Sequence, residues 1–381
     1  MSGIRIFVLI DAMGWELIRE RPFLAEFLTH QQPLRTLLGF SSGIIPSILT
    51  GRTPAENGMW NLVYFDPEHS PFRGLRKLGT LPGRLLDNRL GRRALTEIGR
   101  RVLGMGSNFD VSVPPQTLPF FHWAESRNIY AREGVPGQAS IFDQLHEKGI
   151  PHKIYSYKDL LTDGEILERA GNDVMSGDKE VYFLYLSELD MFLHLHRSEP
   201  ERIEAKLAWY EEALGRLFRK ARARDASAGL RVFSDHGMTP VSRHCDVAAL
   251  VTGCGFQSPR DYLAVYDSTM ARFWFFSERA REEICRQLRQ LEYARLLTDE
   301  ELREFGVYFS DHRYGEVVML LDPGCIVAES GFNGSGWKPE GMHGYHPDDK
   351  NSDAVFLSSE APRAELESVR DVFGVMQEAL G

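Results

Sequence analysis

Nearly continuous apolar runs of strand length recur along the chain. They cover residues 4–10 (IRIFVLI), 181–186 (VYFLYL) and 230–233 (LRVF), and 315–321 (GEVVMLL) is predicted as another buried strand in a last third of mixed pattern. Strands with this pattern are typically buried on both faces of a parallel sheet, whereas strands with one face in water alternate apolar and polar residues. We therefore expect a sheet that is mostly parallel and covered by helices.

Amphipathic stretches fill the intervals between these runs. A period of about 3.6 residues predicts helices from Trp15 to about Leu28, over 141–148, around 160–170 and over 200–224. A further strand is expected at 153–157. Strands and helices in alternation indicate βαβ units, so the predicted fold class is α/β.

The alternation lapses between residues 61 and 135. This stretch holds a basic helical segment at 84–103 and the aromatic sequence Phe120-Phe121-His122-Trp123. We interpret 61–135 as a cap inserted into a core made of 1–60 and 136–381. The aromatic side chains are expected to form the cap's own small core, with stacking on a substrate ring as the alternative.

Aspartates and a histidine follow the apolar runs. Asp11 comes directly after the first run, Asp190 follows the second after a short turn, and Asp235 and His236 follow the run at 230–233. Ligands of open α/β sheets collect at the carboxyl ends of the strands. These side chains are therefore candidates for a single site.

Two more histidines extend this set. His194 lies four residues after Asp190, which places both side chains on one face if the turn is helical, and His343 lies on a late loop bounded by glycines. Mixed Asp and His donors suit Zn²⁺, and also Mn²⁺ where carboxylates dominate. Each residue alone is more often structural, but their joint occurrence favours a centre for two metals.

A tandem serine opens the segment 41–52 (SSGIIPSILTGR). The sequence predicts a sharp loop that leads into a short helix, which Gly51 ends. A helix N-terminus offers free backbone N–H groups and a partial positive charge, and both favour a phosphate. Ser41 is therefore placed for chemistry, with an ordinary N-cap serine as the alternative.

Length, net charge and cysteine content limit the expected number of domains, the partners and the cellular compartment. The 381 residues suffice for one large domain with an insertion or for two domains. A formal net charge of -10 leaves no basic footprint, so no nucleic-acid partner is expected. The four cysteines are scattered without the spacing of a metal or redox site, which favours reduced thiols in a cytosolic protein.

The apolar runs are too short to cross a membrane. None approaches the roughly 18 residues of a transmembrane helix, so no membrane partner is expected. The first run reaches Asp11 without room for the basic region, longer apolar stretch and cleavage site of a secretory signal. These features predict a cytoplasmic location.

Five motifs resemble the alkaline phosphatase superfamily on its nucleotide pyrophosphatase/phosphodiesterase side. They are LIDAMG at the first strand end, Ser41 nine residues before the Thr of ILTGR, SELDMFLH, FSDHGM and GMHGYHP. They occur in the family's order and span nearly the full length, except for the cap. The resemblance implies a three-layer α/β/α sandwich with a mostly parallel central sheet and an inserted cap.

The resemblance also implies two metal sites. One is expected to use Asp11, Asp235 and His236 with Ser41 as nucleophile, and the other Asp190, His194 and His343. Zn²⁺ is the expected metal, with Mn²⁺ as the alternative. Asn61 is the candidate phosphate contact, because relatives often carry an asparagine shortly after the nucleophile helix.

Some positions depart from the family pattern or leave a choice. Nucleotide pyrophosphatases usually carry Thr where this chain has Ser41, and Ser42 competes with Ser41, although the spacing to Thr50 favours Ser41. His196 competes with His194, but six residues from Asp190 it does not share the helical face.

The sulfatase branch needs Pro and Arg two and four residues after its modified residue. Gly43 and Ile45 occupy those positions here, which argues against a sulfatase.

The expected mechanism is in-line attack of Ser41 on phosphorus. Two metals about 4 Å apart hold the entering and leaving oxygens, and water hydrolyses the resulting phosphoserine. This predicts a hydrolase of phosphodiester or pyrophosphate bonds in a small phosphate ester or nucleotide-like substrate. The alternatives are a phosphomonoesterase, a transferase of the phosphoryl or phosphoethanolamine type, or an inactive relative that binds a phosphorylated ligand.

Overall fold

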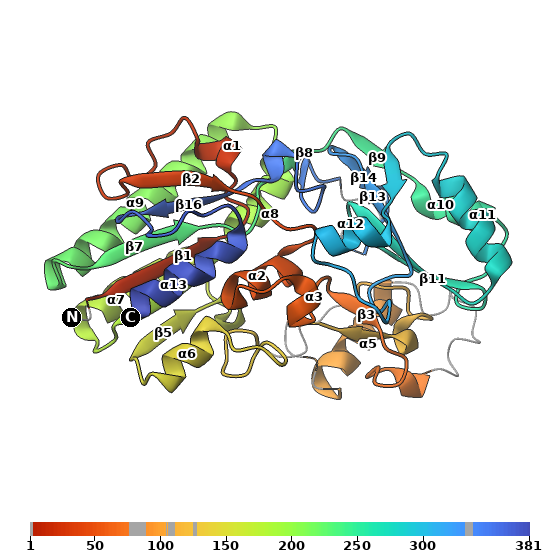
Figure 1. Ribbon diagram of the computed structural model, residues 1–381, viewed down its shortest axis with the longest axis horizontal. Coiled ribbons are helices and arrows are strands. Elements are labelled where there is room, and N and C mark those ends of the chain that lie inside the picture. Colours follow the sequence, from red (N-terminus) through yellow and green to blue (C-terminus); the bar gives the residue numbers. More distant parts are fainter. Residues whose placement is uncertain (1–2, 76–88, 104, 106–110, 125–127, 332–337) are drawn as a thin grey trace. The chain divides into compact units, whose positions relative to one another are not determined.

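A computed structural model describes the chain except for residues 1–2, 76–88, 104, 106–110, 125–127 and 332–337 (Figure 1). It divides into two compact units. The first comprises residues 1–59, 127–240 and 339–381, and the second comprises 60–126 and 241–338. The second unit therefore holds most of the predicted cap together with a long later segment that we expected in the core.

The first unit is built on a six-stranded sheet in the order β2-β16-β7-β1-β6-β5. Its strands are β1 (Arg5–Ile10), β2 (His30–Leu34), β5 (His152–Tyr155), β6 (Val181–Leu186), β7 (Gly229–Phe233) and β16 (Ala354–Ser358). Strands β5, β6, β1 and β7 pair in parallel, and β16 is antiparallel to both β7 and β2. The predicted α/β class with a mostly parallel sheet is confirmed.

Helices cover both faces of this sheet. They are α1 (Trp15–Ile18), α2 (Ser41–Thr50), α3 (Pro54–Asn57), α6 (Ile141–Glu147), α7 (Asp163–Ser176), α8 (Glu188–His196), α9 (Pro200–Arg224) and α13 (Val372–Leu380). Short 3-10 turns are η3 (Tyr157–Asp159), η4 (Lys350–Ser352) and η5 (Val369–Asp371). Figure 1 shows α7 and α9 along one face of the sheet and α2, α6 and α13 along the other. The three-layer arrangement matches the predicted one.

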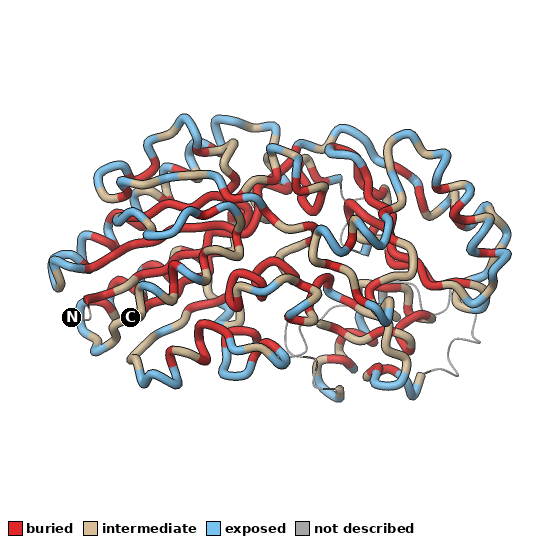
Figure 2. The backbone as a smooth tube through the Cα atoms, in the orientation of Figure 1, coloured by how far each residue is buried: buried red, intermediate tan, exposed pale blue. Residues whose placement is uncertain are grey.

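The apolar runs became strands because both of their faces are covered. In β1, Ile6 and Val8 belong to the core shared with α7 and α9. On the opposite face, Phe183 of β6 meets Phe142 of α6 edge to face, with ring centroids 5.1 Å apart. Figure 2 shows the central strands buried along nearly their whole length.

The helix expected from Trp15 to about Leu28 is much shorter than predicted. Helix α1 ends at Ile18. Pro22 disfavours helical backbone at the residue before it, and Leu24 has a left-handed φ of 53°. The segment therefore continues as turns, and the prediction was wrong over 19–28.

The second unit has a four-stranded antiparallel sheet in the order β10-β11-β13-β12. The sheet consists of β10 (Tyr262–Tyr266), β11 (Met270–Phe275), β12 (Ala294–Leu296) and β13 (Val317–Leu321). Two separate strand pairs of this unit are β3 (Val63–Phe65) with β4 (Phe121–Trp123), and β9 (Arg243–Cys245) with β14 (Cys325–Val327). Its helices are α5 (Arg89–Arg101), α10 (Val247–Gly253), α11 (Glu278–Leu288) and α12 (Asp299–Glu304), with the 3-10 turn η2 (Leu118–Phe120). The basic helix predicted over 84–103 is α5; residues 84–88 lie outside the described part.

The aromatic sequence at 120–123 contributes to a core that extends beyond the predicted cap, rather than to a core of the cap's own. Phe121 and Trp123 are buried in one cluster with Leu263 and Trp274. The cluster therefore joins the predicted cap to the later segment, which explains why 241–338 belongs to the same unit. In the described part of the chain, no helix is both long and apolar enough to span a bilayer.

Candidate active site

The parallel register brings the predicted carboxylates to one edge of the first unit's sheet. Leu9 of β1 lies opposite Tyr185 of β6 and Phe233 of β7. Asp11 lies two residues after Leu9, and Asp235 lies two residues after Phe233. Because Leu9 and Phe233 are paired, the two aspartates lie at the same end of neighbouring strands. Strand β6 leads into α8, whose third residue is Asp190.

Helix α2 presents Ser41 to this edge. Ser41 is the first residue of the helix, and the N-cap is Phe40, so Ser41 is not an N-cap serine. Its Oγ lies 3.0 Å from His236 Nε2. Gly51 ends the helix with φ 69°, as predicted, and donates its N–H to Ser47 O at 2.8 Å.

A short antiparallel ladder brings His343 to His236. Strand β15 (Gly341–Met342) pairs with β8 (Thr239–Pro240), so that Met342 lies opposite Thr239. The rings of His236 and His343 stack with centroids 3.7 Å apart and planes inclined by 12°. Residues more than a hundred positions apart thus reach one site through two-residue strands.

The first donor group consists of Asp11, Asp235 and His236, whose ligand atoms all lie within 4.8 Å of one another. His236 Nε2 is 3.2 Å from Asp235 Oδ2 and 3.6 Å from Asp11 Oδ1. This is the donor set that the resemblance implied for the metal site next to Ser41.

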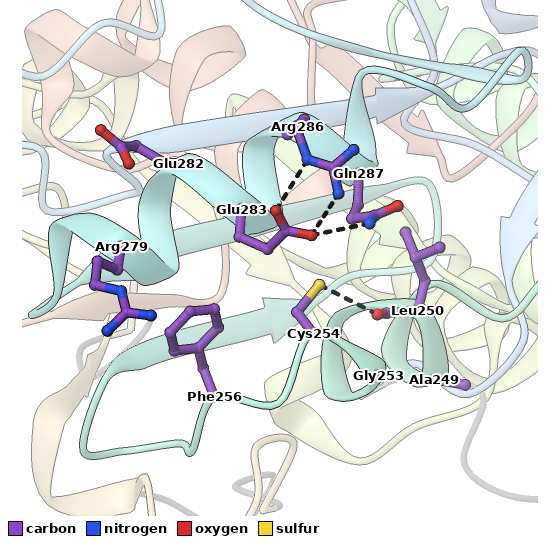
Figure 3. Close-up of a pocket in the computed structure, with 10 residues that line it drawn as sticks. All are labelled: Ala249, Leu250, Gly253, Cys254, Phe256, Arg279, Glu282, Glu283, Arg286 and Gln287. Carbon is purple, nitrogen blue, oxygen red and sulfur yellow. Dashed lines mark hydrogen bonds and ion pairs between the residues drawn. The ribbon is translucent and has the colours of Figure 1, made fainter.

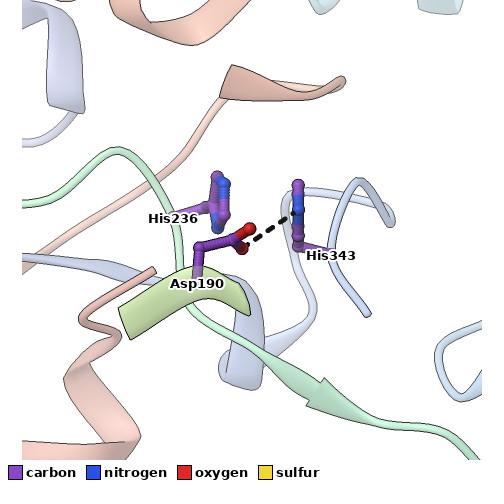
Figure 4. A group of neighbouring side chains, drawn as sticks. All are labelled: Asp190, His236 and His343. Carbon is purple, nitrogen blue, oxygen red and sulfur yellow. Dashed lines mark ion pairs between the residues drawn. The ribbon is translucent and has the colours of Figure 1, made fainter. Parts of the chain in front are cut away.

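The second donor group consists of Asp190, His236 and His343 (Figure 4). His343 Nε2 lies 3.4 Å from Asp190 Oδ1, and His194 Nε2 lies 3.3 Å from Asp190 Oδ2. The sequence placed His194 in this group but not His236. In the structure, His236 belongs to both groups, which makes them neighbours.

Hydrogen bonding leaves one oxygen of each of two carboxylates turned toward the site. Tyr185 Oη donates to Asp11 Oδ2. Asp235 Oδ1 accepts the N–H groups of Ala12 and His236 at 3.3 and 3.0 Å. The sequence analysis missed Tyr185, because only the register of β1 and β6 brings its hydroxyl to Asp11.

The remaining oxygens fit a bound cation. Within the described residues, Asp11 Oδ1, Asp235 Oδ2 and Asp190 Oδ1 are buried and have no hydrogen-bond partner. A buried carboxylate oxygen without a donor costs free energy, and coordination of a metal removes that cost. Together with the imidazoles, these oxygens form the mixed donor set that suits Zn²⁺ or Mn²⁺.

Two histidines are held in the tautomer that a metal requires. His194 Nδ1 donates to Gly341 O at 2.7 Å, and His236 Nδ1 donates to Gly237 O at 2.9 Å. In the neutral rings each bond places the proton on Nδ1, so the lone pair is on Nε2, the atom nearest the carboxylates. Burial is outweighed by Asp190, which raises the pKa of His194, so a cation would displace a proton from that ring.

The carboxylates repel one another. Burial, followed by the nearby charges of Asp235 and Asp190, raises the pKa of Asp11 well above its ordinary value. A divalent cation between these groups would relieve the repulsion and restore the ionised form.

In the second donor group the pKa of the carboxylate is lowered rather than raised. Burial raises the pKa of Asp190, but the charge and hydrogen bond of His194 outweigh burial and hold this pKa below its ordinary value. Burial and the neighbouring His236 lower the pKa of His343 well below its ordinary value. Asp190 is thus a carboxylate and His343 a neutral imidazole, the forms that bind a metal.

The other candidates lie outside the donor groups. His196 Nδ1 pairs with Glu199 Oε1 at 2.6 Å, away from Asp190. Asn61 belongs to the second unit, where it is fully buried and its Nδ2 donates to Met270 Sδ at 3.5 Å. Its contact with phosphate stays a prediction.

A pocket of about 840 Å³ lies between α10 and α11 in the second unit (Figure 3). Its lining combines apolar side chains, such as Leu250 and Phe256, with charged ones, such as Arg279. Figure 3 shows Glu283 bound to Arg286 and Gln287. It shares no residue with the two donor groups.

Comparison with known families gives a match over nearly the whole chain. The family described as type I phosphodiesterase / nucleotide pyrophosphatase matches residues 6–346. A comparison with curated proteins gave no match.

Solved structures with the same fold include ectonucleotide pyrophosphatase/phosphodiesterase 5 from two mammals. The human protein has a TM-score of 0.71 at 14% identity, over 99% of this chain and 94% of that one. The murine protein has a TM-score of 0.69 at 15% identity, over 99% and 95% of the two chains. An inactive murine variant in complex with AMP has a TM-score of 0.69 at 16% identity, over 99% and 95%.

Proposed function

The chain belongs to the type I phosphodiesterase/nucleotide pyrophosphatase family, and we propose that it cleaves a phosphodiester or pyrophosphate bond with Ser41 as nucleophile. Family membership makes it a phosphodiesterase-like hydrolase. The observation that supports the finer proposal is the position of Ser41 Oγ, 3.0 Å from the Nε2 of His236, the one residue common to both donor groups.

Two divalent cations fit the donor groups. Asp11, Asp235 and His236 would hold one, and Asp190 and His343 with His194 or His236 would hold the other. When bound, such ions polarise phosphoryl oxygens and favour the alkoxide form of a serine at neutral pH. Zn²⁺ is our first choice and Mn²⁺ our second, from the mixture of imidazole and carboxylate donors.

The residues of the chain itself bind and orient the reacting groups. Ser41 Oγ lies 3.0 Å from His236 Nε2, the atom that would bind a cation because Nδ1 bonds Gly237 O, so the hydroxyl oxygen is held beside the first donor group. The open N–H groups in the first turn of α2 are suited to the nonbridging phosphoryl oxygens. Ser41 Oγ would form a bond to phosphorus as the leaving oxygen departs, and water would later hydrolyse the phosphoserine.

We propose that the substrate is a diester rather than a monoester. Among the described residues, the ion pairs of Asp11, Asp190 and Asp235 are all with histidines rather than with Lys or Arg. A diester carries one negative charge, whereas a dianionic monoester needs further positive charge. A nucleotide-like diester or pyrophosphate is the substrate class we propose, and the structure of a murine neighbour with AMP is consistent with it.

A paired assay tests this function. Turnover of bis-p-nitrophenyl phosphate and p-nitrophenyl phosphate is measured with Zn²⁺ or Mn²⁺, for the unmodified protein, Ser41→Ala and Ser42→Ala. We expect faster diester cleavage, lost by at least 10³-fold in Ser41→Ala and largely kept in Ser42→Ala, since a nucleophile cannot be replaced by its neighbour. Preference for the monoester, or equal activity of Ser41→Ala, would refute the proposal.

A further inference from the structure

A buried carboxylate outside the site holds the start of α8. Asp163 is the first residue of α7 and only 1% exposed. Its Oδ1 accepts the N–H of Ser187 at 3.0 Å, and its Oδ2 accepts the N–H of Glu188 at 3.2 Å. Tyr210 of α9 donates its hydroxyl to the same Oδ2.

Helix α8 has no cap of its own at this end. Its N-cap is Ser187, whose side chain makes no capping hydrogen bond. The N–H groups at a helix start need acceptors, and a carboxylate there also interacts favourably with the helix dipole. Asp163 supplies that acceptor from another helix, and Glu188 Oε1 accepts the N–H of Asp163 in return at 3.2 Å.

Asp190 lies close to the anchored N-terminus of α8. It is the third residue of α8, two positions after Glu188, whereas His194 lies one turn further along. His194 has a separate anchor, because its Nδ1 bonds Gly341 O at 2.7 Å. A shift of the helix start therefore moves the Asp190 carboxylate more than the His194 ring.

We propose that Asp163 is a positioning residue that sets the place of Asp190 in the second donor group by holding the N-terminus of α8. The inference rests on the proposed function, because it assumes that this group binds a metal. Loss of the anchor should weaken the group of Asp190, His236 and His343 while sparing Asp11 and Asp235, which leave the sheet on other segments.

Metal titration of the apoprotein tests this proposal. Calorimetric Mn²⁺ binding is compared for the unmodified protein, Asp163→Asn and Asp190→Asn. The two N–H groups bond to different oxygens of Asp163, and Asn replaces one of these oxygens by an NH2 donor, so one bond is lost. We therefore expect one binding event to weaken by 10- to 100-fold and the other to stay within about twofold. The weakened event should be the one that Asp190→Asn abolishes.

Asp143 gives a matched control. It is a buried carboxylate of the same unit that accepts the N–H groups of Glu133 and Ser140 at 2.6 and 2.8 Å, but its helix α6 holds no residue of the donor groups. Asp143→Asn should lower stability to urea and leave both Mn²⁺ affinities unchanged. Equal weakening in Asp143→Asn and Asp163→Asn, or unchanged binding in Asp163→Asn, would overturn the proposal.

If Asp163→Asn does not fold, Tyr210→Phe is the variant that tests the proposal. It removes one donor to Asp163 and should weaken the same event several-fold, and unchanged affinity would count against the anchor. Failure of the proposed function has a different signature. In that case the unmodified protein binds two Mn²⁺ but cleaves neither ester, and the comparison of Mn²⁺ affinities still applies.

Discussion

At the scale of single residues, the donor groups depend on neighbours that do not touch a phosphate. Tyr185 is the clearest case, because its hydroxyl occupies Asp11 Oδ2 and leaves Oδ1 toward the site. Burial and the adjacent Asp11 raise the pKa of Tyr185 well above its ordinary value, so the phenol remains a donor. The tyrosine thereby counters part of the repulsion that disfavours the Asp11 carboxylate.

Replacement of Tyr185 by Phe should therefore reduce metal affinity. The Asp11 carboxylate loses a donor that favours its charged form, and we expect a 10- to 100-fold weaker affinity for Zn²⁺ or Mn²⁺. Competition with a chromogenic chelator measures this. Tyr182→Phe is the control, because Tyr182 lies on the same strand and donates instead to Asp173 O at 3.1 Å. Equal effects of the two changes would show that Tyr185 acts through strand packing alone.

Asp353 gives a prediction for how the stability of the protein depends on pH. Burial, followed by the neighbouring Asp349, raises the pKa of Asp353 from 3.8 to about 6. Because the folded state holds this proton more tightly than the unfolded chain, the stabilising contribution is complete below pH 3.8 and is lost as the pH rises through about 6. The full shift would be about 3 kcal/mol, and partial exposure reduces it to about 1 kcal/mol.

Asp353→Asn removes this titration. At pH 8 the variant should be more stable than the unmodified protein by about 1 kcal/mol, and near pH 4 the two should be equal. Urea unfolding at both pH values measures the difference. A difference that is the same at pH 4 and pH 8 would contradict the assignment.

At the scale of elements, α2 is the helix on which Ser41 depends. Pro46 lies inside it, and Thr50 Oγ1 donates back to Pro46 O at 2.7 Å. The helix ends at Gly51, whose N–H reaches Ser47 O. Its end packs closely against α13, since a Cβ at Gly51 would lie 2.7 Å from Phe373 Cδ1.

Gly51→Ala should be more destabilising than the same change at Gly58. Both glycines have positive φ, 69° and 81°, which costs an alanine about 1 kcal/mol. At Gly58 the space around a Cβ is open, whereas at Gly51 Phe373 must also move, for a total of about 2–3 kcal/mol. Denaturant midpoints compare the two, and equal losses would contradict the role of Phe373.

At the scale of the whole molecule, the site lies in one of the two units. All residues of both donor groups, and Ser41, belong to the first unit, although they come from segments between Asp11 and His343. Their buried, mutually repelling carboxylates destabilise the metal-free fold. Bound cations should therefore stabilise this unit against unfolding.

Chelation should lower the melting temperature. Ligand at a hundred times its Kd stabilises the folded state by about 2.7 kcal/mol, and loss of that contribution shifts a domain of this size by several degrees. Calorimetry with EDTA, and again after excess Mn²⁺, measures the shift and its reversal. Asp235→Asn should reduce the response, and a protein freed of metal without a change in melting temperature would contradict the expectation.

The sequence alone determined the apolar strands β1, β6, β7 and β13, the α/β class and the candidate Asp, His and Ser residues that meet at one edge of the sheet. Apolar runs and motif spacings are local properties, and burial of β1, β6 and β7 follows from them directly. The antiparallel strands β2 and β16 and the early end of α1 escaped prediction, because their sequences show no comparable local pattern.

Tertiary structure alone decided the unit boundaries, the place of His236 in both donor groups and the roles of Tyr185 and Asp163. Each depends on which distant segments pack together: Phe121 against Trp274 in one core, His236 against His343 through a two-residue ladder. Such contacts follow from register and packing across the fold, and no local pattern of side chains encodes them.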